Sequence, residues 1–402
     1  MAEIIIIGIC VLLLVSYFFD ITTRFSKVPS VILLLLTGWF LNQISGLFDF
    51  VIPNLNSLLP ILGTVGLILI VLDGSLELEL NRSKKSLIKK TIIVALIPVL
   101  IIGIGFATYL HLEWGYPFKQ SLENIIPFCI ISSAIAIPSS INLSASKREF
   151  VIYESSLSDI LGVIFFNFAT FGTAITLSSV MVFTWQFFLM LIISVVASLI
   201  LAFLLGKIDH HIKYGPIIIL TILIYEISKI YHLPALIFIL FFGLVLGNID
   251  EMKHLKILKS FRFTKMNREV RHFKDVVVEA TFIVRSIFFL VFGFVIQTED
   301  IINPESLVWS VSILFFVYLI RFLMLKFAKM EMSPLLLIAP RGLITILLFL
   351  AIAPDQKIPF INQSVIIQVI IISTLIMMIG VLFSNKEIKK VKEQLADEHP
   401  KI

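Results

Sequence analysis

The chain has 402 residues, of which 58% are hydrophobic and 15% charged, whereas an average soluble domain has roughly 45 to 50% and about 25%. This composition excludes a soluble globular protein and indicates one that is built into a lipid bilayer. The formal net charge of +5 does not indicate nucleic-acid binding, because the basic residues lie in short segments between apolar runs, where they set the orientation in the membrane.

Apolar runs of about 20 residues, the length that crosses a hydrocarbon core about 30 Å thick, recur along the chain. The thirteen predicted spans lie near residues 3–20, 28–47, 58–76, 91–110, 124–141, 150–178, 182–206, 215–231, 233–249, 276–296, 306–328, 333–354 and 362–384. The first run has no basic segment before it and no cleavage site after it, so we interpret it as a helix and not a signal peptide. The sequence therefore predicts an all-α polytopic membrane protein, with a transmembrane domain at 1–384 and a short tail at 385–402.

The basic residues predict which loops face the cytoplasm. Of the 32 lysines and arginines, 26 fall in segments on one side of the predicted membrane. The other side carries Lys119, Lys229 and Lys357, and three arginines lie within spans. Because basic loops stay in the cytoplasm, we expect a multi-pass protein of the plasma (cytoplasmic) membrane, with its N-terminus outside and its C-terminus inside. Residues 248–274 are expected to form a basic cytoplasmic linker, which could lie on the membrane surface as an amphipathic helix.

Two spans carry helix breakers in their interior. The span at 124–141 contains Pro138, and the span at 333–354, seven spans later, contains Pro340 followed by Arg341 and Gly342. An odd offset makes the two helices run in opposite directions, as an inverted repeat requires. Proline removes a backbone donor, so we expect each helix to unwind at its proline and to expose free carbonyls. A simple kink in a continuous helix stays open as the alternative.

One carboxylate is predicted to lie near the middle of the membrane. Asp159 follows the start of its span by about ten residues, which places it about 14 Å deep. Ser155 is four residues earlier and shares its helix face. Hydroxyl and carboxylate oxygens suit a hard cation, and a carboxylate can hold either a cation or a proton. This competition predicts cation–proton exchange at Asp159; the alternative is a structural carboxylate.

Other charged residues within spans are costly and therefore expected to face a cavity or each other. Arg321 falls at about the depth of Glu154, so these two could pair, and Arg285 is about as deep as the carboxylate at the midplane. Arg341 follows the break in its helix. Each arginine could instead bond carbonyls that the breaks set free. Asp73 could belong to an entry funnel or simply end its helix.

Several segments together resemble the monovalent cation:proton antiporter superfamily, nearest its sodium/proton exchanger branch. The similar segments are Val28–Ile32 with Thr37 and Gly38, Leu62–Gly66, Asp73–Glu77, Glu154–Asp159, Phe288–Gly293 and Arg341–Gly342. The most specific is Glu-Ser-Ser-Leu-Ser-Asp at 154–159, which is similar to the family's Glu-Ser-Leu-Leu-Asn-Asp signature.

The resemblance implies a secondary transporter whose Asp159 binds a monovalent cation, Na⁺ or K⁺, and a proton in turn, and whose Arg321 pairs with Glu154. It implies a homodimer, each subunit having a dimerisation domain and a mobile core of helices five, six, twelve and thirteen. No cofactor and no enzymatic activity are expected, since no span carries a metalloprotease, serine-hydrolase or nucleotide-binding motif. The alternative is a channel-like or non-exchanging sensor protein on the same fold.

The sequence departs from the family pattern at two places. Ser158 stands where the signature has Asn or Asp, which leaves one carboxylate and favours electroneutral exchange. Ala136 and Ile137 stand before Pro138 in place of the usual Thr and Asp. We expect the backbone carbonyls at these two positions, together with Ser155, to complete the ion site; altered cation choice, weak affinity or loss of exchange stays open.

Overall fold

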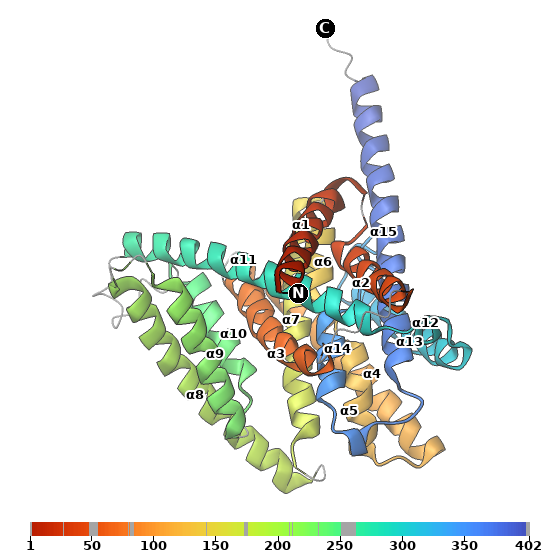
Figure 1. Ribbon diagram of the computed structural model, residues 1–402, viewed down its shortest axis with the longest axis horizontal. Coiled ribbons are helices and arrows are strands. Elements are labelled where there is room, and N and C mark those ends of the chain that lie inside the picture. The colour runs from red at the N-terminus through yellow and green to blue at the C-terminus, as the bar shows by residue number, and fades with distance from the viewer. Residues whose placement is uncertain are drawn as a thin grey trace.

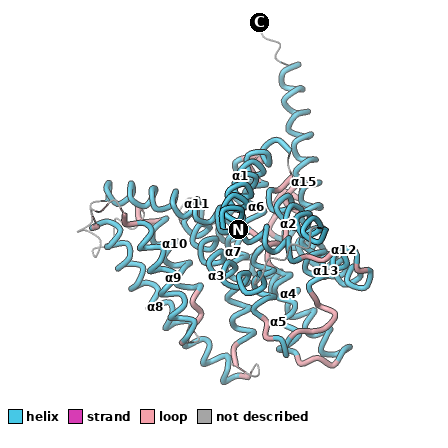
Figure 2. The backbone as a smooth tube through the Cα atoms, in the orientation of Figure 1, coloured by secondary structure: helices cyan, strands magenta, loops and turns pink. Residues whose placement is uncertain are grey.

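The computed structural model describes residues 2–26, 28–47, 55–78, 80, 84–141, 143–172, 176–208, 210, 212–231, 233–250 and 263–398. Helices make up most of these residues, and the remainder are turns and loops (Figure 2). This agrees with the predicted all-α class.

The helices follow one another in chain order and are separated mostly by short connections. They are α1 (Ala2–Ser26), α2 (Ser30–Leu47), α3 (Leu55–Glu77), α4 (Lys85–Trp114), α5 (Phe118–Cys129), α6 (Ser133–Ser139), α7 (Ala145–Thr170), α8 (Leu177–Lys207), α9 (Tyr214–Ile230), α10 (Leu236–Gly247), α11 (Phe263–Val295), α12 (Thr298–Ile302), α13 (Pro304–Phe327), α14 (Leu343–Ala351) and α15 (Gln363–Glu398). A 3₁₀ turn, Pro354–Gln356, lies between the last two.

Within the described residues, eight helical stretches are long and apolar enough to cross a bilayer, and two shorter apolar helices, Ser30–Gly46 and Leu236–Gly247, accompany them. Each of the thirteen predicted spans overlaps a described helix. The predicted span at 124–141 consists of two helices, α5 and α6, with residues 130–132 extended between them. In the span at 333–354, only α14 is helical, after a turn at 333–337 and a non-helical segment at 338–342.

Two membrane helices extend into segments that the sequence predicts to lie outside the membrane. Residues 251–262 of the predicted linker lie outside the described residues, and residues 263–274 form the first turns of α11, which continues into its apolar part without interruption. The short tail predicted at 385–402 is helical as far as Glu398, where it continues α15 (Figure 1). In both cases a charged sequence prolongs a membrane helix, because lysine and glutamate are good helix formers.

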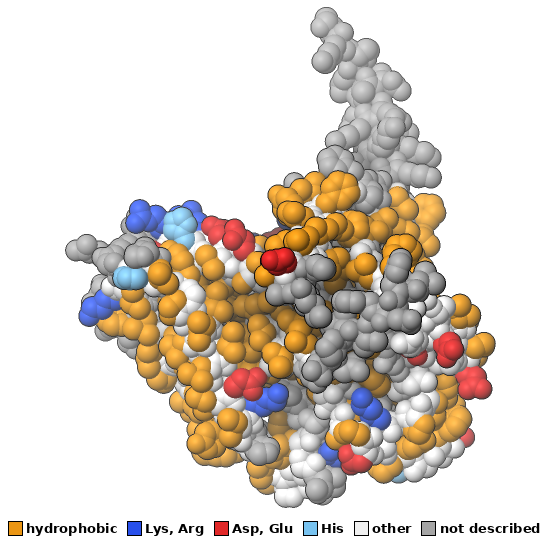
Figure 3. Space-filling view, in the orientation of Figure 1, with side chains coloured by type: hydrophobic (Ala, Val, Ile, Leu, Met, Phe, Trp, Pro, Cys, Tyr) orange, Lys and Arg blue, Asp and Glu red, His pale blue; other side chains and the backbone are white. Residues whose placement is uncertain are grey.

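The helices pack in two groups that meet at α3 and α7. In one group α11 lies against α2 and α3, and α10 against α3 and α8; in the other, α4 packs on α5, α7 and α13, and α13 on α15. In Figure 1, α8, α9 and α10 lie on one side of α3. On its other side lie α4, α5 and α13. Much of the visible surface of both groups is hydrophobic (Figure 3), as lipid contact requires.

Glycines allow the backbones of α2 and α11 to touch. A Cβ on Gly38 would lie 2.2 Å from the Leu290 carbonyl oxygen, and one on Gly293 would lie 2.4 Å from the carbonyl oxygen of Leu35. Small residues at helix crossings are typical of membrane proteins, where packing rather than the hydrophobic effect holds helices together. This contact makes α2 and α11 a close-packed pair within the first group.

Candidate functional site

The break between α5 and α6 leaves backbone groups that other segments satisfy. The Phe128 and Cys129 carbonyls accept hydrogen bonds from the Arg341 guanidinium, at 2.8 and 3.5 Å. The Ile131 N–H donates to Ser158 Oγ at 2.9 Å. These bonds replace the helical ones that α5 and α6 would otherwise share, so the extended segment is buried without orphaned backbone groups at these positions.

The two broken segments cross in direct contact. The Ser132 N–H donates to the Pro340 carbonyl at 2.9 Å. At the crossing a Cβ on Gly342 would lie 2.7 Å from both Ser132 Oγ and Ile135 Cδ1, so a glycine allows the close approach. The Arg341 N–H, next in line, donates to Ser373 Oγ on α15 at 3.0 Å. The predicted pair of interrupted helices is therefore present, and the interruptions lie against each other.

Asp159 lies on α7 directly beside this crossing, and only 2% of its surface is exposed. Its Oδ2 accepts hydrogen bonds from the Ser133 N–H, at 3.2 Å, and from the Ser133 hydroxyl. Its Oδ1 is buried and has no hydrogen-bond partner. Among the described residues Asp159 forms no ion pair. A carboxylate with one anchored oxygen and one unpartnered oxygen can receive a proton or a cation on the latter.

Neighbouring side chains of the predicted site have different roles. Ser155 is buried and donates its hydroxyl to the Val151 carbonyl of its own helix at 2.8 Å, which leaves its oxygen lone pairs free. Ser158 uses its oxygen to hold the Ile131 N–H. Asp73 Oδ1, near the end of α3, is buried without a partner. Gly74, beside it, lies against Ser156, whose Oγ would be 3.3 Å from an added Cβ, so this part of α3 faces α7.

Glu154 and Arg321 form a buried ion pair that bridges α7 and α13. Arg321 Nη1 and Nη2 donate to the two carboxylate oxygens, the second at 2.9 Å. The same guanidinium also donates to the Leu335 carbonyl, at 2.7 Å from Nη2, and to the Ile338 carbonyl at 3.0 Å. Arg321 therefore stabilises the turn that precedes the non-helical segment before α14. Glu154 neutralises the positive charge of its guanidinium.

The other two arginines within spans also bond freed carbonyls. Arg341 holds the end of α5 as described above and donates to its neighbour Ala339 at 2.5 Å. Arg285 on α11 donates to the Ala134 carbonyl at 3.4 Å, and its other nitrogen is 3.7 Å from an Asp20 carboxylate oxygen. Ala134 is four residues before Pro138, and proline cannot donate to that carbonyl. These contacts agree with the alternative in which the two arginines bond carbonyls that the breaks set free.

The break in the predicted span at 124–141 does not lie at Pro138, where the sequence predicted it. Pro138 is inside α6, and residues 130–132 are extended six or more positions earlier. The carbonyls of Ala136 and Ile137 both accept from the Ser140 N–H, at 3.1 Å each. Each of these two carbonyl oxygens therefore accepts a hydrogen bond at the end of α6. Proline is tolerated here because α6 is short and because Arg285 donates to the Ala134 carbonyl, which Pro138 cannot bond.

Ser133 is a neighbour of Asp159 for which the sequence predicted no role. The adjacent Ser132 Oγ and the Thr345 Oγ1 of α14 are buried without partners. The signal that could have found them is the pairing of hydroxyl residues with a break, since hydroxyl oxygens can supply the cation ligands missing at positions 136 and 137.

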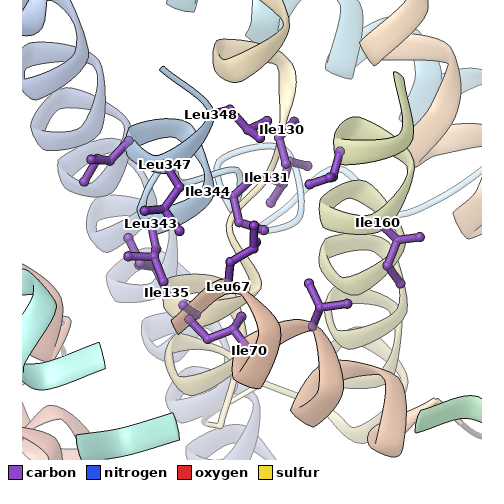
Figure 4. Close-up of a cluster of buried hydrophobic side chains, with 14 of the residues drawn as sticks. Leu67, Ile70, Ile130, Ile131, Ile135, Ile160, Leu343, Ile344, Leu347 and Leu348 are labelled. Atoms are coloured by element: carbon purple, nitrogen blue, oxygen red, sulfur yellow. The ribbon is translucent and has the colours of Figure 1, made fainter. Parts of the chain in front are cut away.

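Hydrophobic side chains surround the crossing on the side of α14. Figure 4 shows Leu67 and Ile70 of α3, Ile130, Ile131 and Ile135 of the broken helix, Ile160 of α7 and four residues of α14, namely Leu343, Ile344, Leu347 and Leu348, within one cluster. These side chains form part of the hydrophobic core of the protein.

The sequence of this chain was compared with known protein families. The sequence profile of the family described as "Sodium/hydrogen exchanger, transmembrane" matches residues 9–385. This chain belongs to that family. No curated protein matches the sequence significantly.

The fold of this exchanger is similar to that of a solved antiporter. The sodium proton antiporter MjNhaP1 from Methanocaldococcus jannaschii, determined at pH 8, superposes with a TM-score of 0.69 at 19% identity, over 95% of this chain and 96% of that one. A structure of the same antiporter from an electron-microscopy map gives a TM-score of 0.68 at 18% identity, over 100% of both chains. The exchanger therefore has the antiporter fold that the resemblance implied.

Proposed function

We propose that this exchanger moves a monovalent cation, Na⁺ or K⁺, across the membrane in exchange for protons, and that Asp159 carries both. The observation that supports this most is the state of the Asp159 carboxylate: buried at the crossing of two broken helices, anchored through Oδ2 and unpartnered at Oδ1. An unpartnered buried carboxylate oxygen is costly unless it binds something. A proton and a cation are the two species that remove this cost, and they exclude each other.

Electroneutral exchange follows from the charges around the site. The neighbouring position on α7 is Ser158, which is uncharged, and Glu154 is neutralised by Arg321. One carboxylate therefore carries one cation in one direction and one proton in the other. Alternating access, in which the group containing α5, α6, α7, α14 and α15 moves relative to α3 and α11, would present Asp159 to each side in turn. The homodimer implied by the resemblance would supply a fixed scaffold for this movement.

Replacing Asp159 by Asn tests this assignment. The amide has nearly the same shape but cannot bind a proton and a cation in turn, so we expect exchange to be lost while the protein still inserts and folds. The measurement is proton flux into proteoliposomes after addition of Na⁺, K⁺ or Li⁺.

The matched control is Glu123→Gln on α5. Glu123 is also buried, at 2% exposed, and pairs with Lys119 away from the crossing. This variant is expected to exchange like the wild type. Normal exchange by Asp159→Asn, with both variants monodisperse in detergent, would refute the proposal that Asp159 carries the ions.

A further inference from the structure

A cavity of about 210 Å³ lies between α3, α7, α9, α10 and α14. Its lining includes residues near the start of α3 (Pro60, Gly63, Thr64), near the end of α7 (Val163, Phe166, Asn167), on the last turns of α9 (Tyr225, Lys229) and at the end of α14 (Leu350, Ala351). These ends all belong to the face opposite the basic loops, which the charge distribution predicts to be outside.

The cavity points toward Asp159. Val163 and Asn167 line it, and they follow Asp159 at intervals of four residues on α7, so the three share one helix face. At 1.5 Å per residue the floor of the cavity at Val163 lies about 6 Å from the level of Asp159, and Asn167 lies about 12 Å from it.

Leucine side chains close the cavity at its inner end. Leu67 and Leu347 line it and also belong to the hydrophobic cluster beside the crossing (Figure 4). Their helices are in tight contact, because a Cβ on Gly63 would lie 2.2 Å from Leu347 Cδ2. Asp159 itself does not line the cavity. A movement of α14 against α3 would separate Leu347 from Leu67 and extend the cavity toward the carboxylate.

Lys229 is the one charged residue in the lining of this cavity. It is exposed and forms no ion pair with a carboxylate of the described residues. It also lines an adjoining cavity of about 560 Å³ together with Asn167 and Gln186. A cation that enters here meets the positive charge of Lys229 at the mouth, which is unexpected for a cation path.

We propose that this cavity is the outer vestibule of the exchanger and that Lys229 lowers the affinity for external cations by electrostatic repulsion. The inference rests on the proposed function and on the predicted orientation. A positive charge about 10 Å from the ion path in a partly aqueous cavity is expected to reduce the local cation concentration about threefold to fivefold. The exchanger would then bind external cations more weakly than it would without this charge.

The first test measures cation affinity from each side. In right-side-out vesicles at low ionic strength, Lys229→Gln should lower the KM for the external cation about threefold to fivefold with an unchanged maximal rate, whereas Lys229→Arg should behave like the wild type. In inside-out vesicles the KM should not change. Added choline chloride at about 0.5 M should abolish the difference, because the Debye length then falls to about 4 Å.

Lys357→Gln is the matched control, since Lys357 is another lysine on the same face and lies over the Phe349 ring instead of in this cavity. An equal change in KM for this variant would show a general surface charge and overturn the proposal. An unchanged external KM in Lys229→Gln, or a change that persists at high ionic strength, would also overturn it.

A second test measures the reaction of a cysteine in the cavity and does not require exchange. Its failure can therefore be distinguished from failure of the proposed function. Asn167→Cys, in a background where the exposed Cys10 is replaced by Ser, is treated from outside with anionic and cationic methanethiosulfonate reagents. The anionic reagent should react faster relative to the cationic one when Lys229 is present, and Lys229→Gln should reduce this ratio about threefold or more. No reaction at position 167, or an unchanged ratio, would refute the vestibule or the role of Lys229.

Discussion

Some charged side chains within the membrane spans hold the backbone, whereas Asp73 and Asp159 each have a buried carboxylate oxygen without a hydrogen-bond partner. The three arginines donate to carbonyls that the breaks or a proline set free, and Glu154 neutralises one of them. Asp159 instead keeps a buried oxygen without a partner. The positions of Glu154 and Arg321 within their spans predicted the ion pair that these residues form. The carbonyls that the arginines bond were not predictable, because these partners come from segments distant in sequence.

Ser133→Ala tests the anchoring of Asp159. The variant removes the hydroxyl that donates to Oδ2 and leaves the backbone N–H in place. Losing a hydrogen bond to the charged carboxylate favours its protonated form, so the profile of exchange rate against pH should shift toward alkaline pH by about one unit, with the maximal rate at high pH retained.

The control is Ser139→Ala in the same short helix, whose hydroxyl donates to the Ile135 carbonyl. This variant should leave the pH profile in place. A profile for Ser133→Ala that superposes on the wild type would show that the hydroxyl does not anchor the carboxylate.

At the level of helices, the sequence predicted which spans are broken but placed only one break correctly. Pro340 and Gly342 lie in the non-helical segment before α14, whereas the other break lies at 130–132 and not at Pro138. Residues 130–132, Ile-Ile-Ser, contain no helix breaker. Their extended conformation is stabilised by Ser158, Arg341 and the Pro340 carbonyl, and such tertiary bonds override local propensity.

The contact between α2 and α11 gives a prediction for Gly38→Ala. The new Cβ would meet the Leu290 carbonyl oxygen and the Phe294 nitrogen, at 2.2 and 2.8 Å, and both are backbone atoms that cannot rotate away. We expect a loss of about 1 to 3 kcal/mol in stability, seen as a lower melting temperature in detergent. Gly46→Ala on the same helix meets no atom within 4 Å and should not lower it; equal melting temperatures of both variants would contradict the close packing.

At the scale of the whole molecule, the count and order of the spans followed from apolar length alone, because a helix must satisfy its backbone within the bilayer. The grouping of the helices did not follow from composition or periodicity. The resemblance assigned four helices to a mobile core, and the contacts of α5, α7 and α13 with α4 show a larger packed group. The cavity lined by Lys229 also required the structure, since its walls come from five separate helices.

The central claim is that one carboxylate binds either a proton or a cation. Its most direct test is the number of protons released into weakly buffered solution when Na⁺ or K⁺ is titrated into the purified exchanger, at a pH where Asp159 is protonated. Because binding is competitive and one acid is involved, the wild type should release about one proton per cation bound, and Asp159→Asn should release none. Cation binding without proton release in the wild type, or equal release by Asp159→Asn, would contradict the account.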